Sequence, residues 1–197
     1  DGITGKVRRF AIGQYYEGKL HARTVTLVDA TGNFSEAHTF DAAKATGKTV
    51  YIRDEQGRQK EIRYYKVSGE LQQRLVYQYK EGMEPVASVL YDAAGTILQT
   101  ASYNHTTDGM IASITGFTTD QKKMFEVIYT YDADRRLTGS RHLNYAGNLF
   151  YQISYEYEKA DAAGNWIQRT KKTWSLDNEL LGTEIEKNFS TFRGEID

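Results

Sequence analysis

Residues 129–137 read Tyr-Thr-Tyr-Asp-Ala-Asp-Arg-Arg-Leu, and this stretch holds the pattern that decides the fold. Large apolar side chains stand at every second position from Phe125 to Tyr131, as in a strand with one buried face. Asp132 then begins a turn, because an Asp side chain accepts hydrogen bonds from the backbone two residues further on. The same order of alternating strand and Asp-led turn recurs along the chain. It predicts an antiparallel β-meander.

Turn signals recur about every 13 residues, which leaves about eight or nine residues for each strand. Gly at the last position of a turn accepts the left-handed backbone that closes a type I turn with a bulge. The predicted turns centre on Gly18, Gly32, Gly47, Gly57, Gly69, Gly82, Gly95, Gly109, Lys122, Arg135, Gly147, Gly164 and Glu179.

Large apolar residues flank several turns at a separation of six. This even spacing can place the two residues opposite each other on one face of an antiparallel pair. The predicted partners are Val28 with Phe34, Tyr65 with Leu71, Tyr91 with Ile97, Tyr131 with Leu137, and Leu143 with Leu149.

The composition supports long, uninterrupted strands. The chain has 197 residues, of which 15 are Tyr and only one, Pro85, is proline. Its 25 Lys and Arg nearly balance its 26 Asp and Glu, so we expect no nucleic-acid partner. There is no Cys, which excludes disulfides and thiolate chemistry.

We therefore predict an all-β protein, an antiparallel meander of about 12–15 strands that is either curled into a roll or folded back as a sandwich. At most one short helix is expected, near residues 35–46, where capping residues precede helix formers such as Ala42. Residues 1–197 are interpreted as a single domain. The most regular repeats span residues 50–175, and a seam is expected near residues 35–49.

The repeats resemble the Tyr-Asp (YD) repeats of RHS proteins, most clearly in residues 129–137, 90–97 and 155–170. They are more similar to short RHS-like envelope proteins and lipoproteins of Bacteroides, which often open with Gly-Lys-Val, here residues 5–7, and end with a Gly-Asn-Trp strand, here residues 164–166. The resemblance implies an extracytoplasmic place, in the periplasm or at the cell surface of a Gram-negative bacterium. At 197 residues the chain is too short for the toxin-enclosing shell of full-length RHS proteins.

The first residues contain neither an initiator Met nor an apolar signal core, so we expect that a signal or lipoprotein leader has been removed. No stretch approaches the roughly 18 apolar residues that cross a bilayer as a helix. Membrane attachment is therefore expected only through a lipid anchor outside this chain.

Motifs for catalysis, cofactors or metals are not recognisable, so no catalytic, cofactor-binding or metal residues are predicted. The Asp residues are explained by their turns. His21, His38, His105 and His142 are isolated in the sequence, and a metal site formed by His105 and His142 across strands is the alternative. A carbohydrate-active hydrolase with paired carboxylates is the alternative to a protein without enzymatic activity.

The surplus of aromatic residues is the best functional clue, since Tyr and Trp rings can stack on sugars or peptides. Tyr129, Tyr131, Tyr155 and Tyr157 follow the apolar alternation, so core packing is the favoured interpretation for them. The candidates for ligand binding are the aromatic residues outside that pattern, together with the two tryptophans: Tyr15, Tyr16, Tyr64, Tyr145, Trp166 and Trp174.

These observations favour a non-catalytic structural or binding module of the cell envelope. It would engage a glycan or an envelope protein through a concave face or an edge strand. Exposed edge strands also make an oligomer an alternative.

Overall fold

The computed structural model describes residues 7–162 and 164–192, which form fourteen strands and no helix. Within these residues, therefore, no helix is long and apolar enough to cross a membrane. The strands are β1 (Val7–Tyr16), β2 (Lys19–Val28), β3 (Phe34–Asp41), β4 (Lys44–Arg53), β5 (Gln59–Tyr65), β6 (Leu71–Gln78), β7 (Ala87–Asp92), β8 (Ile97–His105), β9 (Ile111–Phe117), β10 (Lys123–Tyr131), β11 (Leu137–Asn144), β12 (Leu149–Ala160), β13 (Trp166–Ser175) and β14 (Leu180–Phe192).

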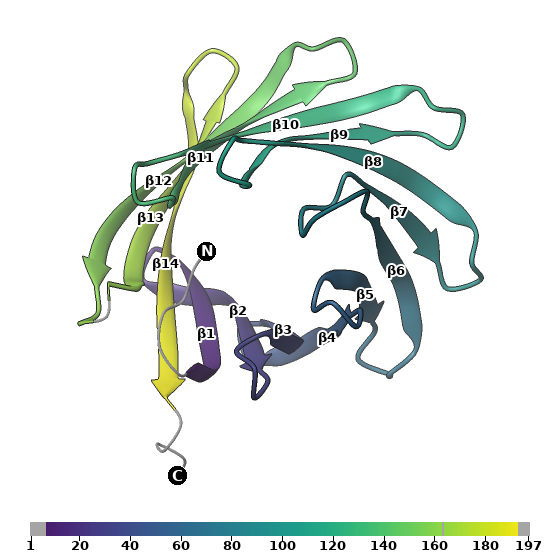
Figure 1. Ribbon diagram of the computed structural model, residues 1–197. Coiled ribbons are helices and arrows are strands. Elements are labelled where there is room, and N and C mark those ends of the chain that lie inside the picture. The colour runs from purple at the N-terminus through teal and green to yellow at the C-terminus, as the bar shows by residue number, and fades with distance from the viewer. Residues whose placement is uncertain (1–6, 163, 193–197) are drawn as a thin grey trace.

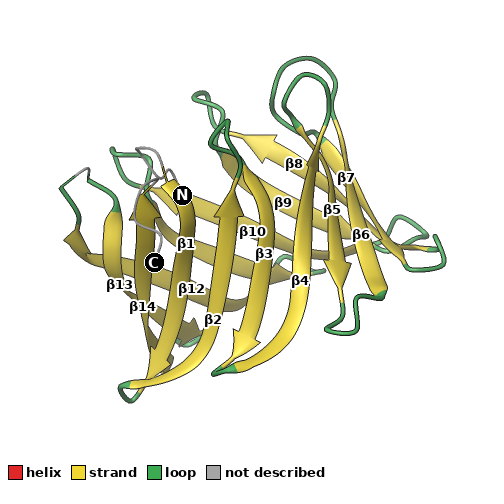
Figure 2. Ribbon diagram, turned by 90° about the horizontal axis from the view of Figure 1, so that it is seen from below, coloured by secondary structure: helices red, strands yellow, loops and turns green. Residues whose placement is uncertain are grey.

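The strands form one closed barrel, in which each strand is antiparallel to its neighbours in sequence (Figures 1 and 2). The ends of the meander join, because β1 pairs with β14 from Val7 opposite Phe192 to Tyr15 opposite Ile185. The all-β, antiparallel prediction is confirmed. The folded-back sandwich is wrong, because the meander closes into a barrel. An oligomer formed through the edges of β1 and β14 would require the pairing between these two strands to open.

The expected helix near residues 35–46 is wrong. These residues form β3 and β4 with a turn at Ala42, whose φ is 48°. The helix formers are used for wall packing instead, since Ala37 is 2% exposed and is paired with Thr26 and Thr49. Barrel contacts here outweigh a weak local helix propensity.

The turn predicted at Gly47 is wrong as well, because Gly47 lies inside β4 opposite Thr39. A Cβ atom there would be 2.9 Å from the carbonyl oxygen of Tyr65. This glycine therefore allows β4 and β5 to approach closely, which is the other common reason for a glycine within a strand.

The other hairpins follow the predicted turn chemistry. Asp132 Oδ1 accepts hydrogen bonds from the backbone amides of Asp134 and Arg136 at 3.0 and 2.9 Å, and Arg135 takes the left-handed conformation at φ 63°. In the turns that we centred on Lys122 and Glu179, the left-handed residues are the preceding ones, Gln121 and Asn178. The five predicted pairs of flanking residues are all register partners: Val28 with Phe34, Tyr65 with Leu71, Tyr91 with Ile97, Tyr131 with Leu137, and Leu143 with Leu149.

Alternation along each strand gives the barrel an inner and an outer face. Tyr77 on β6 and Tyr103 on β8 have ring centroids 6.0 Å apart, although β7 runs between them. Ser88 of β7 lies below both rings, is 2% exposed, and shares a 2.8 Å hydrogen bond with the Tyr103 hydroxyl. Large side chains that meet over an intervening strand mark the concave face, so this face lines the lumen.

The lumen is too wide for a continuous apolar core. Fourteen strands with ordinary spacing and tilt give about 28 Å between opposite backbones, more than two layers of side chains can fill. The buried apolar residues in the described part of the chain form only a thin layer: Phe10, Ala37, Ala101, Val127 and Trp166.

Candidate functional site

Five tyrosines form a belt on the lumen wall. One hairpin repeat, which consists of two strands with their turns, spans 26 residues. Each tyrosine therefore occupies the equivalent place on every second strand, namely β4, β6, β8, β10 and β12. Burial raises the pKa of all five phenols, so they are neutral over the physiological range. We call these residues the tyrosine belt: Tyr51, Tyr77, Tyr103, Tyr129 and Tyr155.

A second row lies two residues further along the same strands, toward the end of the barrel that we call the Asp54 end. Three of its members are tyrosines that tie neighbouring strands together. Each hydroxyl donates a hydrogen bond to the carbonyl oxygen twenty residues earlier: Tyr79 to Gln59 at 2.8 Å, Tyr131 to Ile111 at 3.0 Å, and Tyr157 to Leu137 at 2.9 Å.

The other two positions of the second row hold Arg53 and His105 in place of tyrosine. Each carries a buried nitrogen without a hydrogen-bond partner, Nε of Arg53 and Nε2 of His105. Buried polar atoms in proteins are nearly always satisfied. The two positions of the second row without tyrosine are therefore also positions with an unsatisfied buried nitrogen.

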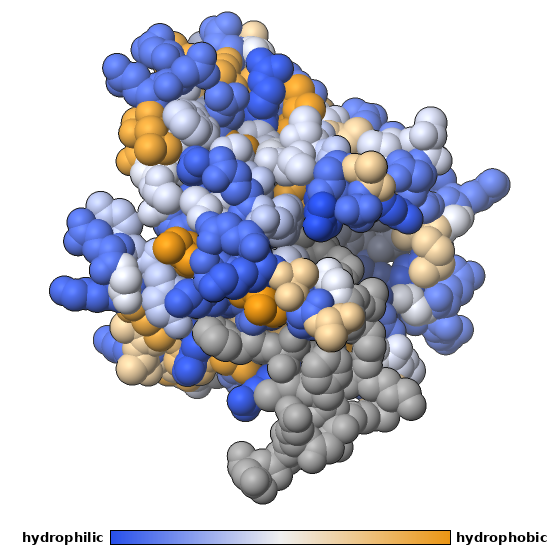
Figure 3. Space-filling view, turned by 90° about the vertical axis from the view of Figure 1, so that its left-hand side faces the viewer, coloured by the Kyte–Doolittle hydropathy of each residue, from blue (hydrophilic) through white to orange (hydrophobic). Residues whose placement is uncertain are grey.

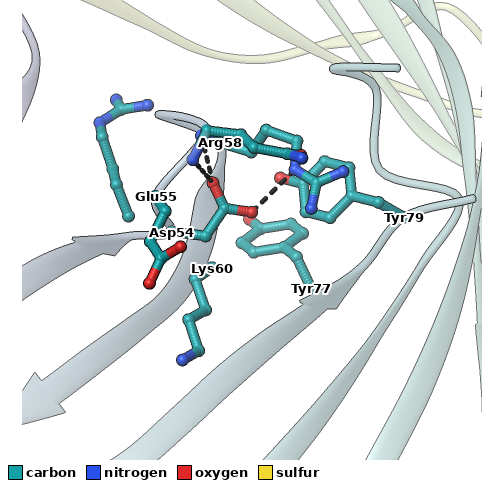
Figure 4. A pocket seen from close by; sticks show the side chains of 8 residues that line it. Asp54, Glu55, Arg58, Lys60, Tyr77 and Tyr79 are labelled. Atoms are coloured by element: carbon teal, nitrogen blue, oxygen red, sulfur yellow. Dashed lines mark hydrogen bonds and ion pairs between the residues drawn. The ribbon is translucent and has the colours of Figure 1, made fainter. Parts of the chain in front are cut away.

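A cavity of about 570 Å³ opens at the Asp54 end, beside Arg53 and the belt residue Tyr77. Figure 4 shows the labelled side chains that converge on it from the β4–β5 turn, β5 and β6. It is lined by Arg53, Asp54, Glu55, Gln56, Arg58, Lys60, Tyr77 and Tyr79.

One ion pair forms a fixed wall of this cavity. Asp54 Oδ2 is 2.7 Å from Arg58 Nε, and the Arg58 guanidinium lies 4.5 Å from the ring centroid of Tyr79 (Figure 4). Asp54 Oδ1 also accepts hydrogen bonds from the backbone amides of Gln56 and Arg58. Burial alone would raise the pKa of Asp54, but these hydrogen bonds and the guanidinium outweigh it and lower the pKa. Both charges are thus neutralised locally.

The remaining charges of the cavity are Arg53, Lys60 and Glu55. Arg53 donates one hydrogen bond, from Nη1 to the carbonyl oxygen of Gly57 at 2.8 Å. Lys60 is exposed and makes no hydrogen bond or ion pair to the described part of the chain. With Asp54 and Arg58 paired, the cavity keeps one net positive charge.

The opposite wall of the lumen, on β13, β14 and β1, is polar. Arg169 and Glu186 form a buried ion pair at 2.6 Å, each side chain being 7% exposed. The guanidinium also lies 4.4 Å from the Tyr155 ring centroid and 4.3 Å from that of Trp166. The lumen therefore has an aromatic arc on one side and hydrogen-bonding groups on the other.

The outer face carries charged side chains on most strands: Arg23, Glu36, Lys48, Arg63, Arg74, Glu126, Arg141, Glu156, Lys172 and Lys187. Some of them cover aromatic rings, as Arg74 does at 4.2 Å from the Tyr91 centroid. On the flank that Figure 3 shows, hydrophobic residues form separate patches among hydrophilic ones. The outer face therefore mixes charged and apolar side chains.

The structure does not bring the six predicted ligand-binding aromatics together. Tyr64 faces the lumen beside the tyrosine belt, and Trp166 is buried at the lumen wall against Arg169. The other four lie outside the lumen or at its far rim: Tyr15 under Lys187, Tyr16 and Tyr145 with 56% and 73% exposure, and Trp174 donating to Ser154 Oγ on the outer face.

The two histidines of the alternative metal site also lie apart. His142 stacks on Tyr151 with centroids 4.1 Å apart and shares a hydrogen bond with Ser140, whereas His105 belongs to the second row. Within residues 7–162 and 164–192 no three His, Asp or Glu side chains are grouped to hold a metal ion. The Gly-Lys-Val segment is almost wholly outside the described residues.

Sequence reasoning missed Tyr51, Tyr77, Tyr103 and Arg53. Their signal is present in the sequence, since the belt and the second row each recur every 26 residues. A turn every 13 residues reveals the strands, but only the doubled period reveals which tyrosines share one place in the lumen.

No protein-family profile matches this chain, and neither does any curated protein sequence. The resemblance to YD-repeat envelope lipoproteins therefore stays a prediction. A crystal structure described as TcdB2-TccC3-TEV overlaps with a TM-score of 0.23 at 12% identity, covering 85% of this chain and 12% of that one. This TM-score is too low for an argument about fold.

Two solved structures share the barrel. A porin-like protein from Bacteroides uniformis ATCC 8492 matches with a TM-score of 0.60 and 10% identity, over 94% of this chain and 98% of that one. A porin-like protein from Bacteroides vulgatus ATCC 8482 matches with a TM-score of 0.50 and 11% identity, over 95% and 98%. This chain is thus similar in fold to porin-like proteins of Bacteroides.

Proposed function

We propose that this protein is a non-catalytic binding module of the bacterial cell envelope, and that its lumen binds a glycan. The observation that carries the proposal is the two-sided lumen, in which the tyrosine belt faces a polar wall. A sugar presents an apolar C–H face and a rim of hydroxyl groups. The first matches neutral phenol rings, and the second needs donors and acceptors such as the less buried Lys171 and Glu184 of the same wall.

The outer face supports a barrel that stands in water. A barrel that spans a bilayer presents an apolar band about 25 Å tall, and an outward Arg or Lys near its midplane costs about 2–4 kcal/mol. Here charged residues such as Arg74 and Lys172 lie in the middle of their strands. The porin-like titles and Bacteroides source of the structural neighbours support an envelope location, in the periplasm or at the cell surface.

The test is glycan binding by the purified chain, first on an array and then by calorimetry with the best oligosaccharide. Replacing a belt ring in Tyr129→Leu should weaken binding by about tenfold, the effect of losing one stacked ring. The control is Tyr145→Leu, which removes a 73% exposed tyrosine from a turn and should leave affinity unchanged. Urea melts of both variants check that the barrel is intact.

Two results would contradict the proposal. An array on which no glycan is retained above background would refute glycan binding. A loss of affinity that is equal in Tyr129→Leu and Tyr145→Leu would show that the belt is not the binding surface. The hydrolase alternative is followed in the same samples, because release of new reducing ends from the bound oligosaccharide would show catalysis.

A further inference from the structure

The second row offers the sharpest clue to what kind of glycan the lumen takes. At three of its positions the residue is a tyrosine that ties adjacent strands, so this residue serves the fold. Arg53 stands in the same row but does not tie adjacent strands in this way, since the hydrogen bond of its side chain goes to Gly57 in the turn that follows. Instead it places a cationic side chain with an unpartnered, buried Nε at the edge of the cavity.

We propose that the cavity at the Asp54 end recognises the anionic group of an acidic sugar, with Arg53 and Lys60 as the anion-binding residues. This inference rests on the proposed glycan-binding function and names the class of glycan. The anionic group is a carboxylate, as in a uronic acid, or a sulfate ester, which offers the same acceptor oxygens.

The charges of the cavity fit this ligand. Asp54 and Arg58 neutralise each other at 2.7 Å, so neither is available to a ligand as a free charge. Arg53 and Lys60 then exceed the single remaining carboxylate, Glu55, by one charge. Arg side chains bind carboxylates and sulfates through paired N–H donors, and such charge-assisted hydrogen bonds are about twice as strong as neutral ones.

The aromatic rings of the cavity fit the rest of a sugar. Tyr77 lies on the lumen face of β6 and Tyr79 directly after that strand (Figure 4). Both line the cavity together with Arg53 and Lys60. The Tyr79 hydroxyl is held by Gln59, and one side of its ring faces Arg58. A ring-shaped ligand can therefore contact the phenols while its charged group reaches Arg53 and Lys60. A cavity of about 570 Å³ is large enough for one or two sugar rings.

The experiment compares glycans that differ only in charge. Calorimetry of the full chain uses an oligogalacturonate, the same oligosaccharide as its methyl ester, and a sulfated oligosaccharide of similar length. We expect an anionic form to bind at least about tenfold tighter than the methyl ester, and to lose affinity as salt is raised. The preference between the carboxylate and sulfate samples identifies the anion.

Variants assign the effect to the cavity. Lys60→Gln and Arg53→Tyr should each reduce the affinity for the anionic form by about tenfold and leave the affinity for the methyl ester unchanged. Tyrosine already stands at three other positions of the second row, so the barrel should accept Arg53→Tyr, and a urea midpoint within about 1 M of the parent's separates loss of binding from loss of folding. The matched control is Lys66→Gln, which removes one positive charge from an exposed pair at the other end of the barrel.

The outcomes separate the two proposals. Equal affinity for the acid and its methyl ester, or an acid preference that survives Arg53→Tyr and Lys60→Gln, would overturn the anion site while glycan binding stands. Binding of none of the three oligosaccharides, together with a blank glycan array, would overturn both.

Discussion

The buried ion pair of the lumen wall gives the strongest stability prediction, for the substitution Glu186→Gln. Both side chains of the pair are 7% exposed, and Glu186 Oε2 lies 2.6 Å from Arg169 Nε. Burial lowers the pKa of Arg169, but the Glu186 carboxylate outweighs this effect and raises it. A guanidinium is basic enough to stay protonated at neutral pH even when its partner is neutralised. The variant therefore leaves a buried cation without its counter-ion.

The expected cost follows from the surroundings of that cation. Breaking a buried pair by removing one partner typically costs about 3–5 kcal/mol. The ring faces of Tyr155 and Trp166 and the hydroxyl of Tyr157, at 3.2 Å, still stabilise the guanidinium, which favours the lower end. We expect a loss of about 3 kcal/mol. With a urea m-value of about 2–3 kcal/mol/M, the midpoint falls by about 1–1.5 M.

Urea melts followed by circular dichroism measure this loss. The control is Glu70→Gln, which breaks the exposed Lys66–Glu70 pair and should cost less than about 0.5 kcal/mol. The double variant Arg169→Met with Glu186→Leu should recover most of the stability, because an apolar pair needs no counter-charge. If Glu186→Gln loses no more stability than Glu70→Gln, the pair is not a buried charge pair in solution and the reasoning fails.

Gly95→Val should lower the free energy of unfolding by about 1–2 kcal/mol, because Gly95 has a φ of 89°, which a β-branched residue adopts only under strain. The control is Gly182→Val. Both glycines have open space around the Cβ position, but Gly182 has no positive φ, so this variant should keep the stability of the parent. Burial lowers the pKa of His142 in the folded protein, so as pH falls the unfolded chain takes up a proton at this residue before the folded protein does. The free energy of unfolding should therefore decrease as pH drops below 6.5. In urea melts, His142→Gln should reduce this dependence on pH. The backbone hydrogen bond from Arg136 is the largest of the effects that lower the pKa of Asp132 in the folded protein. The contribution of the Asp132 carboxylate to folding stability is therefore complete above pH 3.8 and is lost as pH falls through the lower folded pKa. Asp132→Asn should therefore show a smaller drop in midpoint between pH 7 and pH 3 than the parent chain.

Hairpins were predictable because their chemistry is local. Asp132 acts on amides two and four residues away, and Tyr131 pairs with Leu137 across the same turn. The wrongly predicted helix shows the limit of local signals. The helix propensity of the residues around Ala37 is outweighed by the strand pairing on both sides of β3. Propensity contributes tenths of a kcal/mol per residue, which two ladders of hydrogen bonds easily exceed.

The candidate site was only partly predictable. Alternation shows that Tyr64 and Tyr65 lie on opposite faces, but it does not say which face becomes concave. Tyr129 and Tyr155 have the same pattern as residues of an apolar core, yet the width of the barrel leaves them lining a lumen. The cavity at Arg53 depends on the β4–β5 turn meeting β6, which no single strand records.

By itself, the sequence determines most of the strands, their antiparallel order and the register of the hairpins with recognisable turns, because these depend on residues a few positions apart; the β3–β4 hairpin is the exception. Only the tertiary structure decides that β1 closes on β14, which side of the sheet becomes the lumen, and that Arg53 and Lys60 share a cavity with Tyr77. These features depend on the number, tilt and curvature of all fourteen strands together.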